Sequence, residues 1–213
     1  IHALLGRCVL HTHPAEVNGL LCARKGRKAL DEVFGSSELD YKYVEYSDPG
    51  YPLAVTLKNS LEAWRQSENG EPDAIFLENH GLFVVDKNAD DALALTREVN
   101  EQVGAEWQRR ASERSLQEVP GISEEECAEL KSRVADTYQP IFGTEPLVEF
   151  SRSAAVQDFL ALPEAEELVS GQPMVPDQVV YCGDMPVWIS AEQAIEKPEE
   201  ILGDALESAE DGA

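Results

Sequence analysis

The chain has 213 residues, and its 41 aspartates and glutamates against 17 lysines and arginines leave a formal net charge of −24. A surface this acidic repels nucleic acid and anionic lipid headgroups, so we expect neither as a partner. No run approaches the roughly 20 apolar residues of a membrane span, and the four cysteines show no CxxC spacing. Because 43% of the residues are hydrophobic, a sizeable core is possible, and we expect a cytoplasmic protein with reduced thiols.

Strand and helix signals alternate along the first part of the chain. Residues 7–11 are mostly apolar and stop at the turn HTHP, which predicts a short strand followed by a helix from Pro14 to Leu21. A second helix is predicted over residues 28–34, and the alternating aromatic segment 40–46 predicts a strand. Leucines and Trp64 recur at helical spacing over residues 53–64, so a third helix is predicted there.

Two apolar runs, 73–78 and 82–85, predict two strands separated by the bend Asn-His-Gly. From Asn88 a long amphipathic helix is predicted, and Ser123 with Glu126 forms a capping box before a further helix that reaches about residue 137. The buried stripe predicted for the long helix consists of Ala92, Leu95, Val99, Val103 and Trp107. Helices between strands indicate a layered α/β domain.

The pattern changes after Pro146. One helix is predicted over residues 148–162, and residues 178–182 with 186–189 predict a hairpin. An acidic segment, a solvated helix or a disordered tail, then follows. We therefore predict a main domain over 1–146, an extension packed on it over 147–189, and an acidic tail over 190–213.

Three of the four histidines lie at predicted strand ends. His11 and His13 are two residues apart, so their side chains project from the same face of one strand. His80 lies at the bend between two strands, and Gly81 beside it permits a tight backbone. Three histidines with a fourth position left open are typical of a catalytic zinc site. The alternative is that all three are ordinary polar residues at strand ends.

Several segments resemble the class II aldolase/adducin family. IHALL, VLHTHPAEVNGLLCA, YVEYSDPGYPLA and DAIFLENHGLFVVDKNADDALALTREVNE are similar to successive parts of its metal-binding domain. EFSRSAAVQDFL and PMVPDQVVYCGDMPVWI resemble the C-terminal extension of a subgroup that includes the aldolase part of rhamnulose-phosphate aldolase fusion proteins. Together these segments cover most of the chain up to about Ile189.

The resemblance implies a three-layer α/β/α fold with a mixed, largely antiparallel sheet. It also implies that His11, His13 and His80 bind Zn²⁺ or another divalent cation. The family chemistry is retro-aldol cleavage of a carbon–carbon bond in a ketose or ketose phosphate, with the metal acting as a Lewis acid toward the enediolate. A tetramer with active sites near subunit contacts is also implied.

The sequence departs from the family pattern in its acid/base residue. The family glutamate lies about four residues before the position of His2, so it would precede Ile1. We therefore expect an N-terminally truncated member that lacks full activity by itself. Glu78, two residues from His80, is our candidate for a substitute acid/base or for a carboxylate that orients a ligand. A structural carboxylate is the alternative.

Substrate contacts are expected from Tyr46, Asp48 and Tyr51, which border a turn that approaches the active site in relatives. The basic cluster of residues 24–28 attracts a phosphorylated substrate or is a solvated helix junction. Asp177-Gln178 replaces a common Asp-His pair of the subgroup, which argues against a site role there.

Other functions stay open on the sequence alone. A sugar-phosphate epimerase or dehydratase of the same family uses the same metal site, whereas an adducin-like module keeps the fold without catalysis. A metal hydrolase needs more histidine and aspartate ligands on later strands, and only His2 is left over.

Overall fold

The structure is a computed structural model. It describes residues 2–6, 8–67, 70–112, 123–151, 153–182, 186, 188–190, 193 and 203. The chain divides into two compact units. The first contains residues 1–114 and 173–181, and the second contains residues 115–172 and 182–213. The predicted domain boundaries at residues 146 and 189 do not coincide with the limits of these two units. They stay a prediction.

The first unit is built on a four-stranded mixed sheet with the strand order β1-β4-β3-β2. Its strands are β1 (Cys8–Thr12), β2 (Tyr41–Val44), β3 (Ala74–Leu77) and β4 (Gly81–Asp86). β4 pairs antiparallel with both β1 and β3, whereas β2 pairs parallel with β3. The four strands expected in the first part of the chain and the mixed, largely antiparallel sheet are confirmed.

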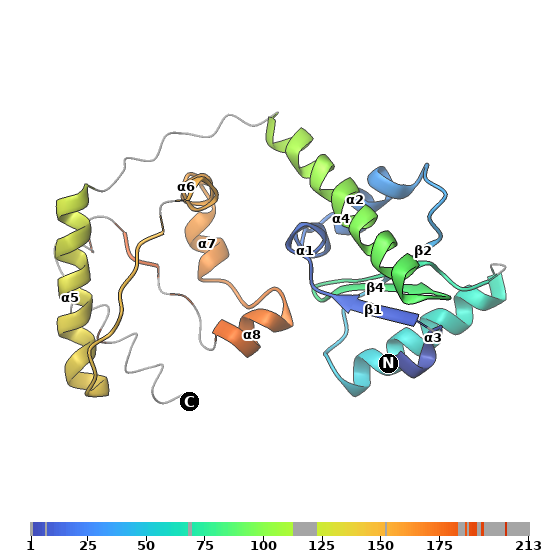
Figure 1. The fold of residues 1–213 in the computed structure, drawn as a ribbon, viewed down its shortest axis with the longest axis horizontal. Coiled ribbons are helices and arrows are strands. Elements are labelled where there is room, and N and C mark those ends of the chain that lie inside the picture. The colour runs from blue at the N-terminus through green and yellow to red at the C-terminus, as the bar shows by residue number, and fades with distance from the viewer. Residues whose placement is uncertain are drawn as a thin grey trace. The chain divides into compact units, whose positions relative to one another are not determined.

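Helices cover both faces of this sheet, which confirms the three-layer architecture (Figure 1). On one face lie α1 (Ala15–Leu21), α2 (Gly26–Phe34) and α4 (Ala89–Ser112). On the other face lies α3 (Tyr51–Ser67). The short 3₁₀ helix η1 (His2–Leu4) precedes β1 in the chain. Alternate residues of β3 serve the two faces: Phe76 packs toward α1, α2 and α4, and Ile75 toward α3.

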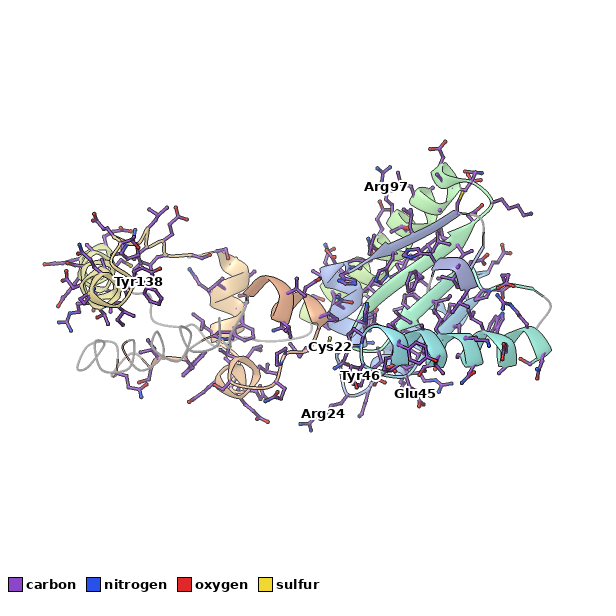
Figure 2. The ribbon with its side chains drawn as sticks, turned by 90° about the horizontal axis from the view of Figure 1, so that it is seen from below. Cys22, Arg24, Glu45, Tyr46, Arg97 and Tyr138 are labelled. Atoms are coloured by element: carbon purple, nitrogen blue, oxygen red, sulfur yellow. The ribbon has the colours of Figure 1, made fainter. Side chains whose placement is uncertain are left out.

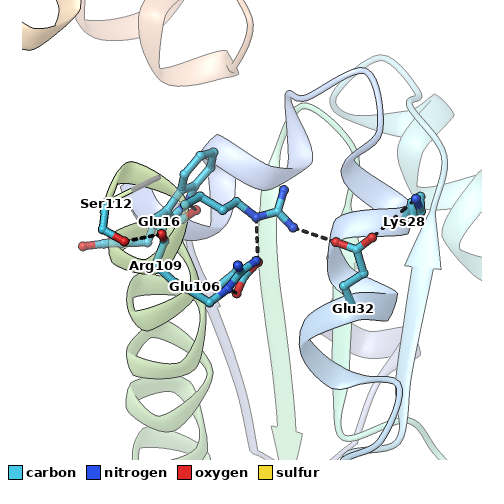
Figure 3. Close-up of polar contacts among 8 residues, drawn as sticks. Glu16, Lys28, Glu32, Glu106, Arg109 and Ser112 are labelled. Carbon is cyan, nitrogen blue, oxygen red and sulfur yellow. Dashed lines mark hydrogen bonds and ion pairs between the residues drawn. The ribbon is translucent and has the colours of Figure 1, made fainter. Parts of the chain in front are cut away.

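Helix α4 is fixed to its neighbours by buried apolar side chains and by polar contacts at its C-terminal end. Ala92, Val99 and Val103 are buried, as the sequence predicted. The Trp107 indole N–H donates to the Glu16 carbonyl at 2.8 Å. Arg110 joins Glu106 of α4, at 2.6 Å, to Glu32 of α2, at 2.8 Å (Figure 3).

The second unit contains α5 (Glu124–Phe142), α6 (Ala154–Leu160) and α7 (Ala165–Val169). The predicted capping box is present, with Ser123 and Glu126 each accepting the other's backbone N–H. The helix predicted over residues 148–162 is wrong in extent. It begins only at Ala154, because Ser153 is extended and its hydroxyl accepts the Val156 N–H as an N-cap.

The predicted strand over residues 178–182 is wrong, because this segment is helix α8 (Pro176–Cys182). Pro176 occupies the first helical position, and Asp177 places a negative charge in the first turn. The Gln178 side chain accepts the N–H groups of Met174 and Val175 just before the helix. These start signals outweigh the strand preference of Val179 and Val180. Most of residues 183–213, including the acidic tail, lies outside the described residues.

Of the helices within the described residues, none is both long and apolar enough to cross a membrane.

Candidate metal centre

Sheet register brings His11, His13 and His80 together. His11 lies in β1, His13 follows β1 directly, and His80 lies in the turn between β3 and β4. Because Thr12 pairs with Leu82, the end of β1 lies beside the start of β4 and therefore beside this turn. The ring centroids are 4.7 Å apart for His11–His13, 5.3 Å for His11–His80 and 5.0 Å for His13–His80.

One ring nitrogen of each histidine is available to a shared ion, and these atoms lie within 4.8 Å of one another. Within the part of the chain that the structure describes, this is the one group of at least three His, Cys, Asp or Glu ligands that is placed to hold a metal. His2, the remaining histidine, touches the His11 and Phe83 rings edge-on but is not part of the group.

Hydrogen bonds on the far side of two rings fix where their protons lie. His11 Nδ1 is 3.0 Å from the Leu82 carbonyl oxygen, and His13 Nδ1 is 2.7 Å from a carboxylate oxygen of Asp177. Both partners accept hydrogen bonds, so in each ring Nδ1 carries the proton. The Nε2 atoms of His11 and His13 face each other at 3.0 Å, and in neutral rings both are bare. A proton or a metal ion shared between these two atoms would satisfy both lone pairs, and the three ring nitrogens of the group are placed to hold a metal.

Burial favours the neutral form of His11 and His80. Desolvation lowers the pKa of His11 to about 4, against the opposing effect of the Leu82 carbonyl, and the neighbouring histidines lower it further. Desolvation also lowers the pKa of His80, helped by His13 and opposed by Asp177. Neutral imidazole is the form that binds metals, and His11 is further held by stacking on Phe83 at 4.0 Å.

Gly81 is needed for space rather than for its backbone freedom. The left-handed residue of the bend is Asn79, with φ of 53°, and Gly81 does not share that conformation. A Cβ on Gly81 would lie 2.5 Å from Cδ2 of His13 and 2.7 Å from the Thr12 carbonyl oxygen. The absence of a side chain therefore lets His13 and the end of β1 lie against β4.

Glu78 has partners other than the histidines. β3 ends at Leu77, so Glu78 and His80 both lie in the turn and do not share a strand face. The Glu78 carboxylate accepts the Tyr46 N–H at 2.9 Å and the Tyr43 hydroxyl. Burial, and then Glu78, raise the pKa of Tyr43.

Glu78 lines a hollow of about 710 Å³ beside the bend. The basic cluster Arg24, Lys25, Arg27 and Lys28 lines it too, together with Tyr46. Figure 2 labels Arg24, Glu45 and Tyr46, all of which border this hollow. Asp48 accepts the Tyr46 hydroxyl at 3.1 Å, whereas Tyr51, at the start of α3, is 81% exposed.

Asp177 is the residue that sequence reasoning missed. Its unusual neighbour Gln178 argued against a site role, yet the carboxylate lies against His13. The helix-start pattern of a proline followed by an aspartate and a glutamine was the available signal. It places Asp177 in a first helical turn but does not indicate which part of the fold that turn contacts.

Part of the chain matches a known protein family. Residues 5–106 match the family model described as Class II Aldolase and Adducin N-terminal domain. Residues 5–106, which include all three converging histidines, are therefore similar to a class II aldolase/adducin domain. No curated protein and no solved structure was found to match the sequence. The subgroup suggested by the C-terminal segments stays a prediction.

Proposed function

We propose that this chain is a metal-dependent lyase that cleaves a carbon–carbon bond of a ketose or ketose phosphate by retro-aldol chemistry. The observation that carries the proposal is the convergence of the Nε2 atoms of His11 and His13, 3.0 Å apart, with His80 supplying the third ligand atom of the group. Three ring nitrogens directed at one position in a partly buried site favour a metal-binding enzyme over a non-catalytic module.

The residues fit a divalent cation, with Zn²⁺ the first candidate. Three neutral imidazoles form the donor set of a catalytic zinc site with one open position. Bound there, the metal would supply a Lewis acid for the oxygens next to the cleaved bond. The Leu82 carbonyl and the Asp177 carboxylate hold His11 and His13 with Nε2 toward the shared position.

The hollow beside the bend is our candidate for the substrate. Its basic cluster, residues 24–28, provides positive charge for a phosphate group in an otherwise acidic protein. Tyr46 lines it, its hydroxyl donates to Asp48, and Tyr51 is exposed further along the chain. These three remain the candidates for contacts with the sugar hydroxyls. Glu78 remains the candidate acid/base, because its carboxylate lines the hollow two residues from His80.

Metal content tests the site directly. We expect protein loaded with zinc and dialysed to retain about one equivalent per chain, as the one group of three histidines implies. Changing His11, His13 or His80 to alanine should abolish retention. His2→Ala is the matched control, because His2 touches the same rings without belonging to the group. Zinc retention that survives in all three variants would refute the site.

Activity separates the remaining functions. Release of an aldehyde and a ketose fragment from ketose phosphates, lost with a chelator and restored by zinc, supports the lyase. Metal-dependent conversion of the sugar phosphate without chain cleavage would instead identify an epimerase or a dehydratase. A protein that binds no metal and converts no sugar phosphate would be an adducin-like module.

We further propose a cytoplasmic homo-oligomer, tetrameric as the resemblance implies, with a small sugar or sugar phosphate as its ligand. The net charge of −24 argues against nucleic acid as a partner. Light scattering of the purified chain gives the oligomeric state.

A further inference from the structure

Asp177 reaches the histidine group from the opposite end of the chain. Its carboxylate lies 2.7 Å from Nδ1 of His13, across 164 positions of sequence. Both side chains are partly shielded from water, with 22% of His13 and 39% of Asp177 exposed. A contact this short between shielded groups fixes the orientation of the imidazole more firmly than a surface ion pair does.

The segment that carries Asp177 is anchored on the same unit as the histidines. Residues 173–181 belong to the first unit. The Cys22 thiol, just after α1, donates to the Met174 carbonyl at 3.6 Å. Several residues of the segment enclose a hollow of about 160 Å³ together with Tyr46, Pro49 and Asn79. Asn79 immediately precedes His80, so the segment packs against the bend that carries the third histidine.

The carboxylate decides which nitrogen of His13 is bare. As an acceptor, Asp177 holds the proton on Nδ1 and leaves Nε2 unprotonated toward His11 and His80. His11 has the same arrangement through the Leu82 carbonyl, an acceptor that belongs to the sheet itself. His13 lies beyond the end of β1, so its acceptor must come from another part of the chain.

We propose that Asp177 is a positioning residue that orients His13 for metal binding, and that the segment 173–181 thereby completes the metal centre. This inference rests on the proposed function. Asp177 acts through His13 rather than as a ligand, because it meets the ring at Nδ1 and does not belong to the group of ligand atoms. Removing such a carboxylate behind a histidine ligand typically weakens metal binding by about 10–100-fold.

Zinc affinity of the full chain provides the first test, measured by competition with a chromophoric chelator. We expect Asp177→Ala to raise the Kd for zinc by about 10–100-fold. Asp90→Ala is the matched control, since Asp90 holds the same second helical position in α4 and contributes the same charge to a first turn. Asp90→Ala should bind zinc as the wild type does.

The metal-free protein gives a second readout, the tautomer of each histidine in long-range ¹H–¹⁵N spectra. Wild-type His13 should carry its proton on Nδ1, and Asp177→Ala should show a mixture of tautomers. His11 should stay unchanged in both proteins, because its acceptor is the Leu82 carbonyl. In Asp177→Asn the tautomer ratio of His13 should fall between those of the wild type and Asp177→Ala. The amide oxygen still accepts from Nδ1, while the amide nitrogen can donate to the other tautomer. This isosteric variant also decides the question if the alanine variant folds poorly.

The outcomes separate this inference from the proposed function. If the wild type binds zinc through His13 and Asp177→Ala binds it equally well, the role of Asp177 is overturned and the metal centre stands. An unchanged His13 tautomer in Asp177→Ala overturns it as well. If the wild type binds no zinc, or His13→Ala binds it normally, the metal centre fails and the inference fails with it.

Discussion

Replacing Gly81 with alanine tests whether close approach of β1 and β4 shapes the histidine group. The new Cβ would lie 2.5 Å from Cδ2 of His13, whereas ordinary contact begins at 3.4 Å. The ring would therefore have to move by about 0.9 Å, several times the tolerance of roughly 0.2 Å on a metal–ligand distance. The new Cβ would also lie 2.7 Å from the Thr12 carbonyl oxygen. This oxygen belongs to the backbone of the paired strand, so it cannot move aside as a flexible side chain would.

Two quantities should change in Gly81→Ala. Overpacking of this kind typically costs about 1–3 kcal/mol of the free energy of unfolding, measurable as a lower urea midpoint. If a similar energy is lost from the metal-bound state, zinc affinity falls by roughly tenfold or more, because each 1.4 kcal/mol corresponds to a factor of ten. His13 cannot yield without weakening its 2.7 Å contact with Asp177.

Gly104→Ala is the control for this experiment. Its Cβ would meet only Glu16 Cγ at 3.8 Å, and it lies inside α4, where alanine is favoured over glycine by roughly 0.5–1 kcal/mol. We expect this variant to gain stability and to bind zinc normally. If Gly81→Ala has the urea midpoint and the zinc affinity of the wild type, the account of Gly81 as a space requirement is refuted.

Three further outcomes are expected. Phe76→Ala, at a fully buried site of the sheet core, should lower the free energy of unfolding by about 3–5 kcal/mol in urea titrations. Arg109 and Arg110 lower the pKa of Glu106 to about 2. The Glu106 carboxylate therefore contributes its full stabilisation above the ordinary glutamate pKa of 4.5 and loses it as the pH falls toward 2. Glu106→Gln should lack this part of the acid unfolding transition, which circular dichroism follows. Ser123→Ala removes an N-cap and should cost roughly 1 kcal/mol, whereas Ser123→Thr should retain most of that stability.

Local signals in the sequence accounted for most of the first unit. The apolar run 73–78 and the leucine spacing of 53–64 are each patterns within one short segment, so they indicated β3 and α3 without knowledge of the fold. The same kind of signal failed at residues 178–182. There the start signals of Pro176, Asp177 and Gln178 compete with a run of β-branched residues, and the capping contacts decide in favour of a helix.

That His11 and His13 lie together was predicted from the sequence, because side chains two apart in extended backbone point to the same side. β1 itself ends at Thr12, one residue before His13. That His80 joins them depends on the antiparallel pairing of β1 with β4, which closes a loop of about 70 residues. The Asp177 contact spans 164 positions, and no local propensity specifies a partner so far away. Tertiary packing decided it, because the segment that leads into α8 meets the folded surface around Cys22 and Asn79.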